Sequence, residues 1–143
     1  MKTRTKIIIA ILLGALVSWL FGKPASQERQ GVLTNVNLQA YHESYNELYF
    51  AGQLPKNVSV EWGNLEYLND MGLTTQRRDG SFSIVIDRAT NQTDKQALMT
   101  LLHEECHVEL DYLERADGLD VHGPAFQSCM LRLASKGAMK DLW

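Results

Sequence analysis

Two histidines and a glutamate occupy a five-residue segment with the spacing of a metal site. The segment His103–His107 has the sequence HEECH, so its two histidines stand four positions apart. On a helix, side chains at that spacing project from one face, with Cβ atoms about 5–6 Å apart. Two such imidazoles can bind one Zn²⁺ ion, and Glu104 can accept a proton from a zinc-bound water. The pattern therefore predicts a hydrolytic zinc site with His103 and His107 as ligands and Glu104 as the catalytic base.

A catalytic zinc ion requires a third protein ligand, and His122 is the candidate in this chain. The metzincin extension of the motif would need Gly at position 110 and His at position 113, where the chain has Leu110 and Leu113. A thermolysin-like glutamate from a later helix also fails, because no glutamate follows Glu114. His122 is the one histidine of the sequence downstream of the motif. We expect it to complete the site, the alternative being a loop histidine that caps the following helix.

The elements that position these side chains can be predicted from apolar patterns and turn signals. Six elements are expected: a helix over 37–50, strands over 58–62, 73–77 and 81–87, and helices that begin near Thr93 and Pro124. Thr93 is followed three residues later by Gln96, the signature of a capping box on the helix that carries HEECH. We expect that helix to end near Leu113 or Glu114. The predicted fold class is α+β, with a small, mainly antiparallel sheet packed with three helices and the metal motif on the second.

The two cysteines have two alternative roles. Cys106 lies within the motif, and Cys129 lies in the last predicted helix. Core packing is the simpler interpretation, because a free cysteine behaves as a small buried hydrophobe. If the domain is exported, the two residues could instead form a disulfide between the last two helices.

Other polar residues on the predicted helices are expected to face solvent. His42 has no partner motif, and we expect it to be an exposed helix residue without a ligand role. Glu105 and Glu109 are also expected to be exposed, although Glu109 or Asp111 could orient a zinc histidine through its second nitrogen. The aromatic residues of the first helix are expected in the core: Tyr41, Tyr45, Tyr49 and Phe50.

The N-terminus has the layout of a secretory signal. Residues 1–6 are basic, and residues 7–21 are fifteen uncharged, mostly apolar residues. A helix of that length reaches roughly 22 Å, which is short of the ~30 Å hydrocarbon core of a bilayer. However, no small-x-small triplet marks a cleavage site, and Trp19 stands where an interfacial anchor would. These features favour an uncleaved signal anchor, with a cleaved signal peptide and a buried helix as the alternatives.

The chain is therefore expected to have three parts. We assign a signal peptide or membrane signal anchor to residues 1–25, a linker to 26–36 and a single domain to 37–143, since 143 residues suit one domain. Positive charge ahead of the apolar segment predicts a cytoplasmic N-terminus and membrane contact through residues 7–22. The domain is then expected outside the cytoplasm, in the periplasm or the extracellular space.

The charge of the domain argues against a nucleic-acid partner. The formal net charge of the chain is −3, but four of its basic residues precede Ala25. From Ala25 onward there are ten basic and seventeen acidic residues, a net charge of −7. Non-specific affinity for nucleic acids comes from Lys and Arg side chains that neutralise phosphates, so a domain this acidic is a poor partner.

Beyond the motif, the chain from about Leu38 to Trp143 resembles the SprT-like (Spartan-type) zinc metalloprotease domain. Five stretches carry the resemblance: YNELYFAGQLP at 45–55, VSVEW at 58–62, IVI at 84–86, LHEECH at 102–107 and HGPAF at 122–126. HExxH alone is widely shared, whereas its combination with these flanking stretches is much more specific. The resemblance implies a zincin-like fold and endopeptidase activity on protein or peptide substrates. The site residues that it implies are His103, His107 and His122 as zinc ligands and Glu104 as the catalytic residue.

The chain also departs from well-known members of that family, which act inside the cell on DNA-associated proteins. Its domain is acidic and its N-terminus resembles a membrane signal, so we expect a membrane-bound or exported relative without a DNA-repair role. In zincins the substrate backbone can add to an edge strand, and Ser83–Asp87 is the candidate by its place before the metal helix. The alternatives to a peptidase are a non-proteolytic, membrane-anchored zinc-binding module and a structural protein with an accidental HExxH.

Overall fold

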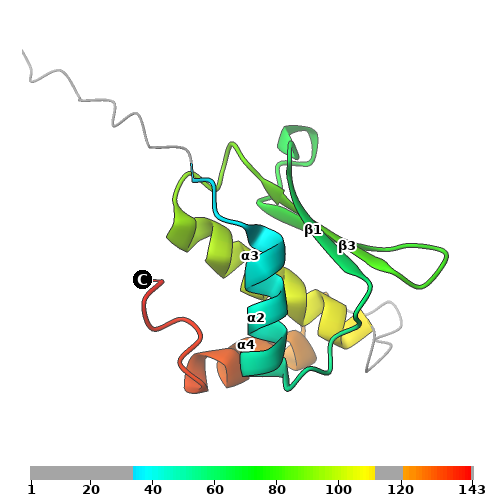
Figure 1. The fold of residues 1–143 in the computed structure, drawn as a ribbon, viewed down its shortest axis with the longest axis vertical. Coiled ribbons are helices and arrows are strands. Elements are labelled where there is room, and N and C mark those ends of the chain that lie inside the picture. Colours follow the sequence, from blue (N-terminus) through cyan, green and yellow to red (C-terminus); the bar gives the residue numbers. More distant parts are fainter. Residues whose placement is uncertain (1–33, 112–120, 143) are drawn as a thin grey trace, which may run out of the picture. The chain divides into compact units, whose positions relative to one another are not determined.

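The computed structural model describes residues 34–111 and 121–142 (Figure 1). In chain order, the elements of these ranges are α2 (Leu38–Phe50), β1 (Val58–Gly63), the 3₁₀ turn η1 (Glu66–Leu68), β2 (Gly72–Gln76), β3 (Phe82–Asp87), α3 (Asp94–Glu109) and α4 (Pro124–Ser135). The predicted α+β class is confirmed: three helices and a small sheet form the described domain, and HEECH lies on the second helix, α3.

Some predictions concern residues outside these ranges. The predicted signal at 1–25 lies outside the described residues, as does most of the predicted linker. The predicted end of the HEECH helix, near Leu113 or Glu114, lies outside them too. Within the described ranges, no helix combines the length and the hydropathy needed to cross a bilayer.

The helices begin at residues that suit a helix N-terminus. The Asn37 side chain accepts a hydrogen bond from the backbone N–H of Ala40 at 3.1 Å, which caps α2. Thr93 and Gln96 form the predicted capping box at the start of α3. Pro124 occupies the first turn of α4, where its missing N–H costs no helical hydrogen bond. Local sequence therefore sets where the two site-bearing helices start.

The sheet is mixed, with β3 in the centre. Its strand order is β1-β3-β2; β2 pairs with β3 antiparallel, and β1 pairs with β3 parallel. The expected antiparallel character holds for the β2–β3 pair alone. The reason is the path of the chain, which reverses direction twice between β1 and β3, so that β3 regains the direction of β1.

The strand order corrects one prediction about the substrate. Ser83–Asp87 lies within β3, and β3 is paired on both sides, so it cannot accept another strand. The prediction used the position of the strand just before the metal helix, but position in the sequence does not determine position in the sheet. The edges of the described sheet are β1 and β2.

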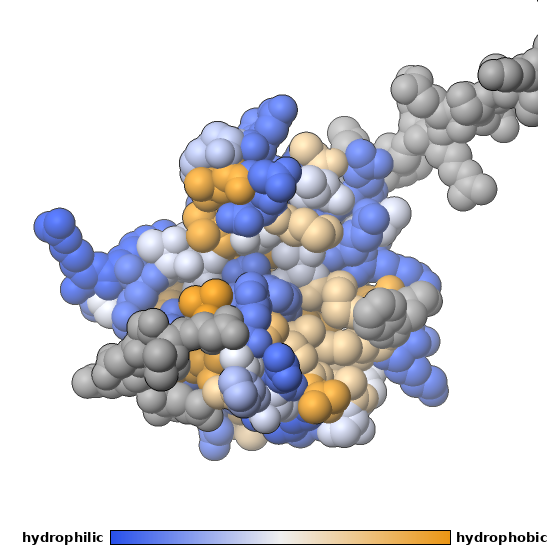
Figure 2. All heavy atoms as spheres, turned by 180° about the vertical axis from the view of Figure 1, so that it is seen from behind, coloured by the Kyte–Doolittle hydropathy of each residue, from blue (hydrophilic) through white to orange (hydrophobic). Residues whose placement is uncertain are grey.

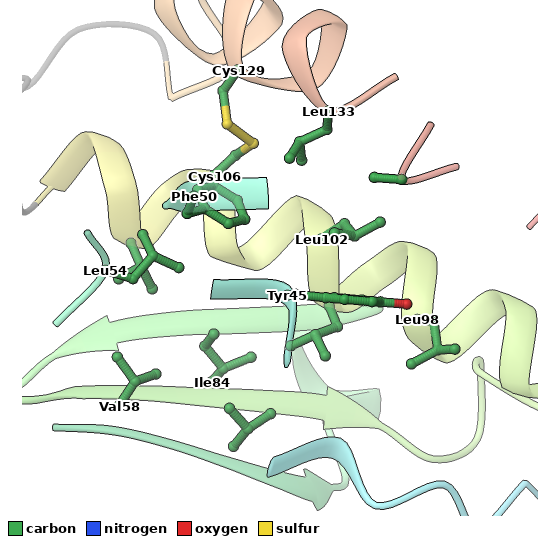
Figure 3. Packing of buried hydrophobic residues seen from close by; sticks show 14 of the residues in the cluster. Tyr45, Phe50, Leu54, Val58, Ile84, Leu98, Leu102, Cys106, Cys129 and Leu133 are labelled. Atoms are coloured by element: carbon green, nitrogen blue, oxygen red, sulfur yellow. A yellow bond between two sulfur atoms is a disulfide. The ribbon is translucent and has the colours of Figure 1, made fainter. Parts of the chain in front are cut away.

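The core has two layers that meet at α3. Phe82, Ile84 and Ile86 alternate along β3 and are fully buried beneath the helices. Figure 3 shows α3 with the sheet on one side and α4 on the other. Leu102 of α3 and Leu133 of α4 are also fully buried. Helix α3 therefore lies in the interior of the domain, packed on more than one face.

The face of the described domain opposite to that of Figure 1 carries both apolar and hydrophilic residues. Orange and pale orange residues adjoin one another over part of its lower half, bordered by hydrophilic ones (Figure 2). The most exposed large apolar side chains of the described residues are Tyr67, Leu131, Val121 and Leu48. Single exposed apolar residues of this kind are normal on a folded domain.

Two polar residues that were expected to be exposed are buried against each other. His42 of α2 is 3% exposed and Glu105 of α3 is fully buried, with 2.9 Å between His42 Nδ1 and Glu105 Oε1. The predictions were wrong because His42 shares a helical face with Leu38 and Tyr45, both of which pack in the core. Tyr41, expected in the core, is instead 40% exposed.

The Glu105 carboxyl is in an unfavourable environment for a charge. Burial raises its pKa to about 7, while the hydrogen bond and the electrostatic interaction with His42 act in the opposite direction. Glu105 Oε2 has no hydrogen-bond partner among the described residues. His42 is therefore the group that makes this buried carboxylate tolerable.

We expect His42→Ala to destabilise the domain by about 3–5 kcal/mol, because it leaves a buried carboxylate without its partner. Urea unfolding of the metal-free protein measures the loss. Glu43→Ala is the matched control, since Glu43 is the exposed neighbour on α2 and should change stability by about 0.5 kcal/mol or less. The double variant His42→Leu/Glu105→Met should recover most of the loss. A cost for His42→Ala no larger than that of the control would contradict this account of the pair.

Candidate metal centre

Three histidines converge at one point of the domain. His103 and His107 project from α3, and His122 lies just before α4. His103 Nε2 is 3.0 Å from His122 Nε2 and 3.2 Å from His107 Nε2. One ligand atom from each of the three residues lies within 4.8 Å of the other two. The structure thus brings together the three histidines that the sequence singled out.

The spacing of the nitrogens fits a tetrahedral zinc ion. Two nitrogens bound to such an ion at 2.0–2.1 Å are about 3.3 Å apart. The two observed Nε2–Nε2 distances, 3.0 and 3.2 Å, are close to that value. Three histidine ligands also leave a fourth position open, as in catalytic zinc sites. The donor set is therefore suited to Zn²⁺.

Two of the imidazoles, those of His103 and His107, are also in a protonation state that suits a metal. Burial, followed by the neighbouring histidines, lowers the pKa of His107 to about 4. Burial and the charge of His122 lower the pKa of His103 in the same way. Both rings are therefore neutral at pH 7, with a lone pair free for a metal.

The histidines line an open cleft of about 900 Å³. Edge strand β2 contributes Gly72, Leu73 and Thr74 to one side of it, and α3 contributes Glu104 beside the histidines. Apolar side chains from three parts of the chain contribute elsewhere: Met99, Met130 and Leu142. The cleft therefore combines a candidate metal site, a carboxylate, apolar surface and a strand edge that no other described strand pairs with.

Comparison with known proteins supports the relationship that these features suggest. The sequence matches the SprT-like family over residues 38–141. The chain belongs to the SprT-like family. No curated protein matches it. Family membership implies a metallopeptidase-like domain, and the histidine cluster of this SprT-like domain is compatible with a zinc ion.

Glu104 of the SprT-like domain is held in place by strand β2. It is 5% exposed, and its Oε2 accepts a 2.7 Å hydrogen bond from the Thr74 hydroxyl. Burial raises the pKa of Glu104 to about 7; the Thr74 hydrogen bond lowers it, and the charge of Asp70 raises it. The carboxylate next to the histidines is therefore oriented by an edge strand and titrates near neutral pH.

Gly72 allows β2 to approach this carboxylate. A Cβ atom at position 72 would lie 2.6 Å from Glu104 Oε1 and 2.7 Å from Thr100 Cγ2. Real Cβ atoms essentially never make contacts that short. A residue with a side chain would therefore displace either the strand or the carboxylate. This role could not be predicted, because glycine in a short turn-rich region usually marks a turn.

Phe126 is a further residue of the site whose role was not predicted. Its ring centroid lies 4.6 Å from those of His103 and His107 and 4.8 Å from that of His122. The periodicity of the last helix indicated only that Phe126 is a core residue. The available signal was the HGPAF stretch at 122–126, which places Phe126 close to His122 in the sequence.

The structure also bears on the predictions for Glu109, Asp111 and the two cysteines. Glu109 pairs with Arg132 of α4 at 2.5 and 2.7 Å, so it neither faces solvent freely nor orients a histidine. Asp111 lines the cleft, and burial raises the pKa of its carboxyl. Cys106 and Cys129 form a disulfide, with Cα atoms 5.9 Å apart, which was the alternative to simple core packing.

We expect the full-length protein to bind one zinc ion per chain, and His122→Ala to weaken binding by more than about 100-fold, because one of three ligands is lost. Competition with a chromophoric chelator measures the affinity. Ser128→Ala is the control, since Ser128 is exposed on α4 and should leave the affinity unchanged. Zinc affinity of wild-type strength in His122→Ala would exclude His122 as a ligand.

Proposed function

We propose that this SprT-like domain is a zinc-dependent endopeptidase. The observation that carries the proposal is the convergence of three imidazole nitrogens beside a buried carboxylate in an open cleft. His103, His107 and His122 would hold the ion without reducing its charge, because all three ligands are neutral. When bound, zinc would supply a Lewis acid that polarises a peptide carbonyl and makes a coordinated water more acidic.

Glu104 is the proposed general base. A base for hydrolysis at neutral pH works best when its pKa is near the working pH, since it must take up a proton and then release it to the leaving amine. Burial of Glu104 moves its pKa in that direction, to about 7. The hydroxyl of Thr74 fixes the carboxylate orientation that this proton transfer requires.

Strand β2 is the proposed docking edge for an extended peptide. Its Gly72–Thr74 segment borders the cleft, and its pairing with β3 uses only one of its two edges. A peptide that adds to the other edge gains backbone hydrogen bonds, with side chains directed alternately into and out of the cleft. Met99 and Met130 would then offer an adaptable apolar surface to a substrate side chain.

The second candidate is a non-proteolytic zinc-binding module with the same fold, anchored to a membrane. It would use the same three histidines but would not need Glu104 as a base. The two candidates therefore differ in what a change at Glu104 does to hydrolysis and to zinc content.

We also propose that the domain acts outside the cytoplasm, with the membrane contacted through residues 7–22 and no nucleic acid as partner. The Cys106–Cys129 disulfide supports this placement, because disulfides persist mainly in oxidising compartments. The net charge of −7 from Ala25 onward supports the absence of a nucleic-acid partner. The mass of the chain after cells are quenched with an alkylating agent tests the placement, since a cytoplasmic chain would carry two alkyl groups.

Glu104→Gln should lower casein hydrolysis by the full-length protein about 10²–10⁴-fold, the usual contribution of a general base. Zinc content should stay at one ion per chain, because Glu104 is not a ligand. The matched control is Glu61→Gln, an exposed position on β1 that should change neither property. Wild-type hydrolysis by Glu104→Gln would contradict the assignment of the base. A zinc-loaded wild type that hydrolyses nothing would favour the non-proteolytic module.

Thr74→Val should raise the pKa of Glu104, because the Thr74 hydrogen bond lowers it and valine has no hydroxyl. A higher pKa keeps the base protonated to a higher pH. The acidic limb of kcat/KM against pH should therefore move to higher pH, and the loss should be larger at pH 6 than at pH 8. Thr75→Val, at the exposed next position of β2, should leave the profile in place. An equal loss at every pH would contradict this role of Thr74.

A further inference from the structure

His122 is the metal-site histidine whose position depends most on tertiary structure. His103 and His107 are one turn apart on α3, so the helix itself fixes their spacing. Fourteen residues separate His107 from His122 in the sequence, and His122 is exposed. His122 directly precedes Gly123, the N-cap of α4, so a displacement of α4 would displace His122 as well.

Helix α4 is joined to α3 by a disulfide that begins inside the metal motif. Cys106 directly precedes His107, and Cys129 lies seven residues after His122. Both half-cystines are buried, at 0% and 1% exposure. Between the disulfide and His122 along α4 lies Phe126, whose ring packs against all three imidazoles. The covalent link therefore acts on the short segment that carries the third histidine.

An ion pair between α3 and α4 holds the two helices together less firmly than the disulfide does. Arg132 and Glu109 form an ion pair, but the Arg132 side chain is 41% exposed, and pairs of that kind contribute little stability. Apolar packing of Phe126 and Leu133 would remain without the disulfide, because both are buried in the core. Loss of the bond should therefore loosen α4 rather than unfold the domain.

We propose that Cys106 and Cys129 are a positioning pair for the metal site, whose disulfide holds His122 against His103 and His107 and thereby sets the affinity for zinc. The proposal rests on the metal site alone and does not depend on peptidase activity. It also makes zinc affinity sensitive to redox conditions. A dithiol would transfer two electrons and two protons to the pair, so that the S–S bond breaks, two thiols form and the dithiol becomes its own disulfide.

The test is the zinc affinity of four full-length proteins, measured by competition with a chromophoric chelator. They are the wild type, Cys106→Ala/Cys129→Ala, His122→Ala, and the variant with all three changes. Alanine is used because free thiols would themselves bind zinc. Removal of the disulfide should weaken zinc binding about tenfold or more when His122 is present, as is typical for groups that orient metal ligands.

The decisive comparison is the effect of removing the disulfide when His122 is present and when it is replaced by alanine. A positioning role through His122 requires that the disulfide has little effect, about twofold or less, once His122 is replaced. The same loss in both backgrounds would show that the disulfide only stabilises the fold and would overturn the proposal. Unchanged affinity in Cys106→Ala/Cys129→Ala with His122 present would overturn it too. Either result leaves the peptidase proposal intact, because Glu104→Gln tests that separately.

Two controls keep the test interpretable. Far-UV circular dichroism and urea unfolding show whether each variant is folded at the temperature of the titration. Should the alanine pair not fold, Cys106→Val/Cys129→Ala restores side-chain volume in the core without restoring the bond. The mass after alkylation of intact cells provides the remaining measurement: a chain with two alkyl groups lacks the disulfide in its native setting, which would overturn the proposal.

Discussion

The packing of α3 in the interior of the domain is the constraint on which the rest of the structure depends. Successive residues of a helix point about 100° apart, so five consecutive residues cover every direction around the axis. In the His103–His107 segment, side chains that point in different directions contact different parts of the domain. The two histidines face the cleft, Glu104 contacts β2, Glu105 contacts α2 and Cys106 is bonded to α4.

The five residues of this segment therefore contribute both to the stability of the domain and to the candidate metal site. The contact with β2 orients the carboxylate, the contact with α2 compensates a buried charge, and the disulfide fixes the helix next to His122. None of these neighbours needs to touch a substrate. They instead restrict how far the histidines and the glutamate can move, which is what a preorganised site requires.

The sequence was informative where a property depends on nearby residues. Spacing alone identified His103 and His107 as one face of a helix, and the capping box located the start of that helix at Thr93. The prediction that His122 joins them came from elimination, and the structure places a ligand atom of each of the three residues within 4.8 Å of the others. The overall class, α+β with three helices, also followed from local patterns.

The properties that could not be predicted depend on contacts between distant segments. Strand order is one of them: nothing local to residues 82–87 shows that β3 lies between β1 and β2. The burial of His42 is another, because helical periodicity defines a face but not its width, and the partner that makes burial tolerable lies 63 residues away. The sequence could not decide between core packing and a disulfide for the two cysteines, since pairing depends on the distance between two helices.

The buried contacts of the HEECH segment also restrict how this sequence can vary in evolution. The HExxH pattern itself places no requirement on its two central positions. Here a change at position 105 leaves His42 without its buried partner, and a change at position 106 leaves a lone buried thiol at position 129. Each central position therefore has a structural partner 63 or 23 positions away, and a replacement at either position disturbs that partner too.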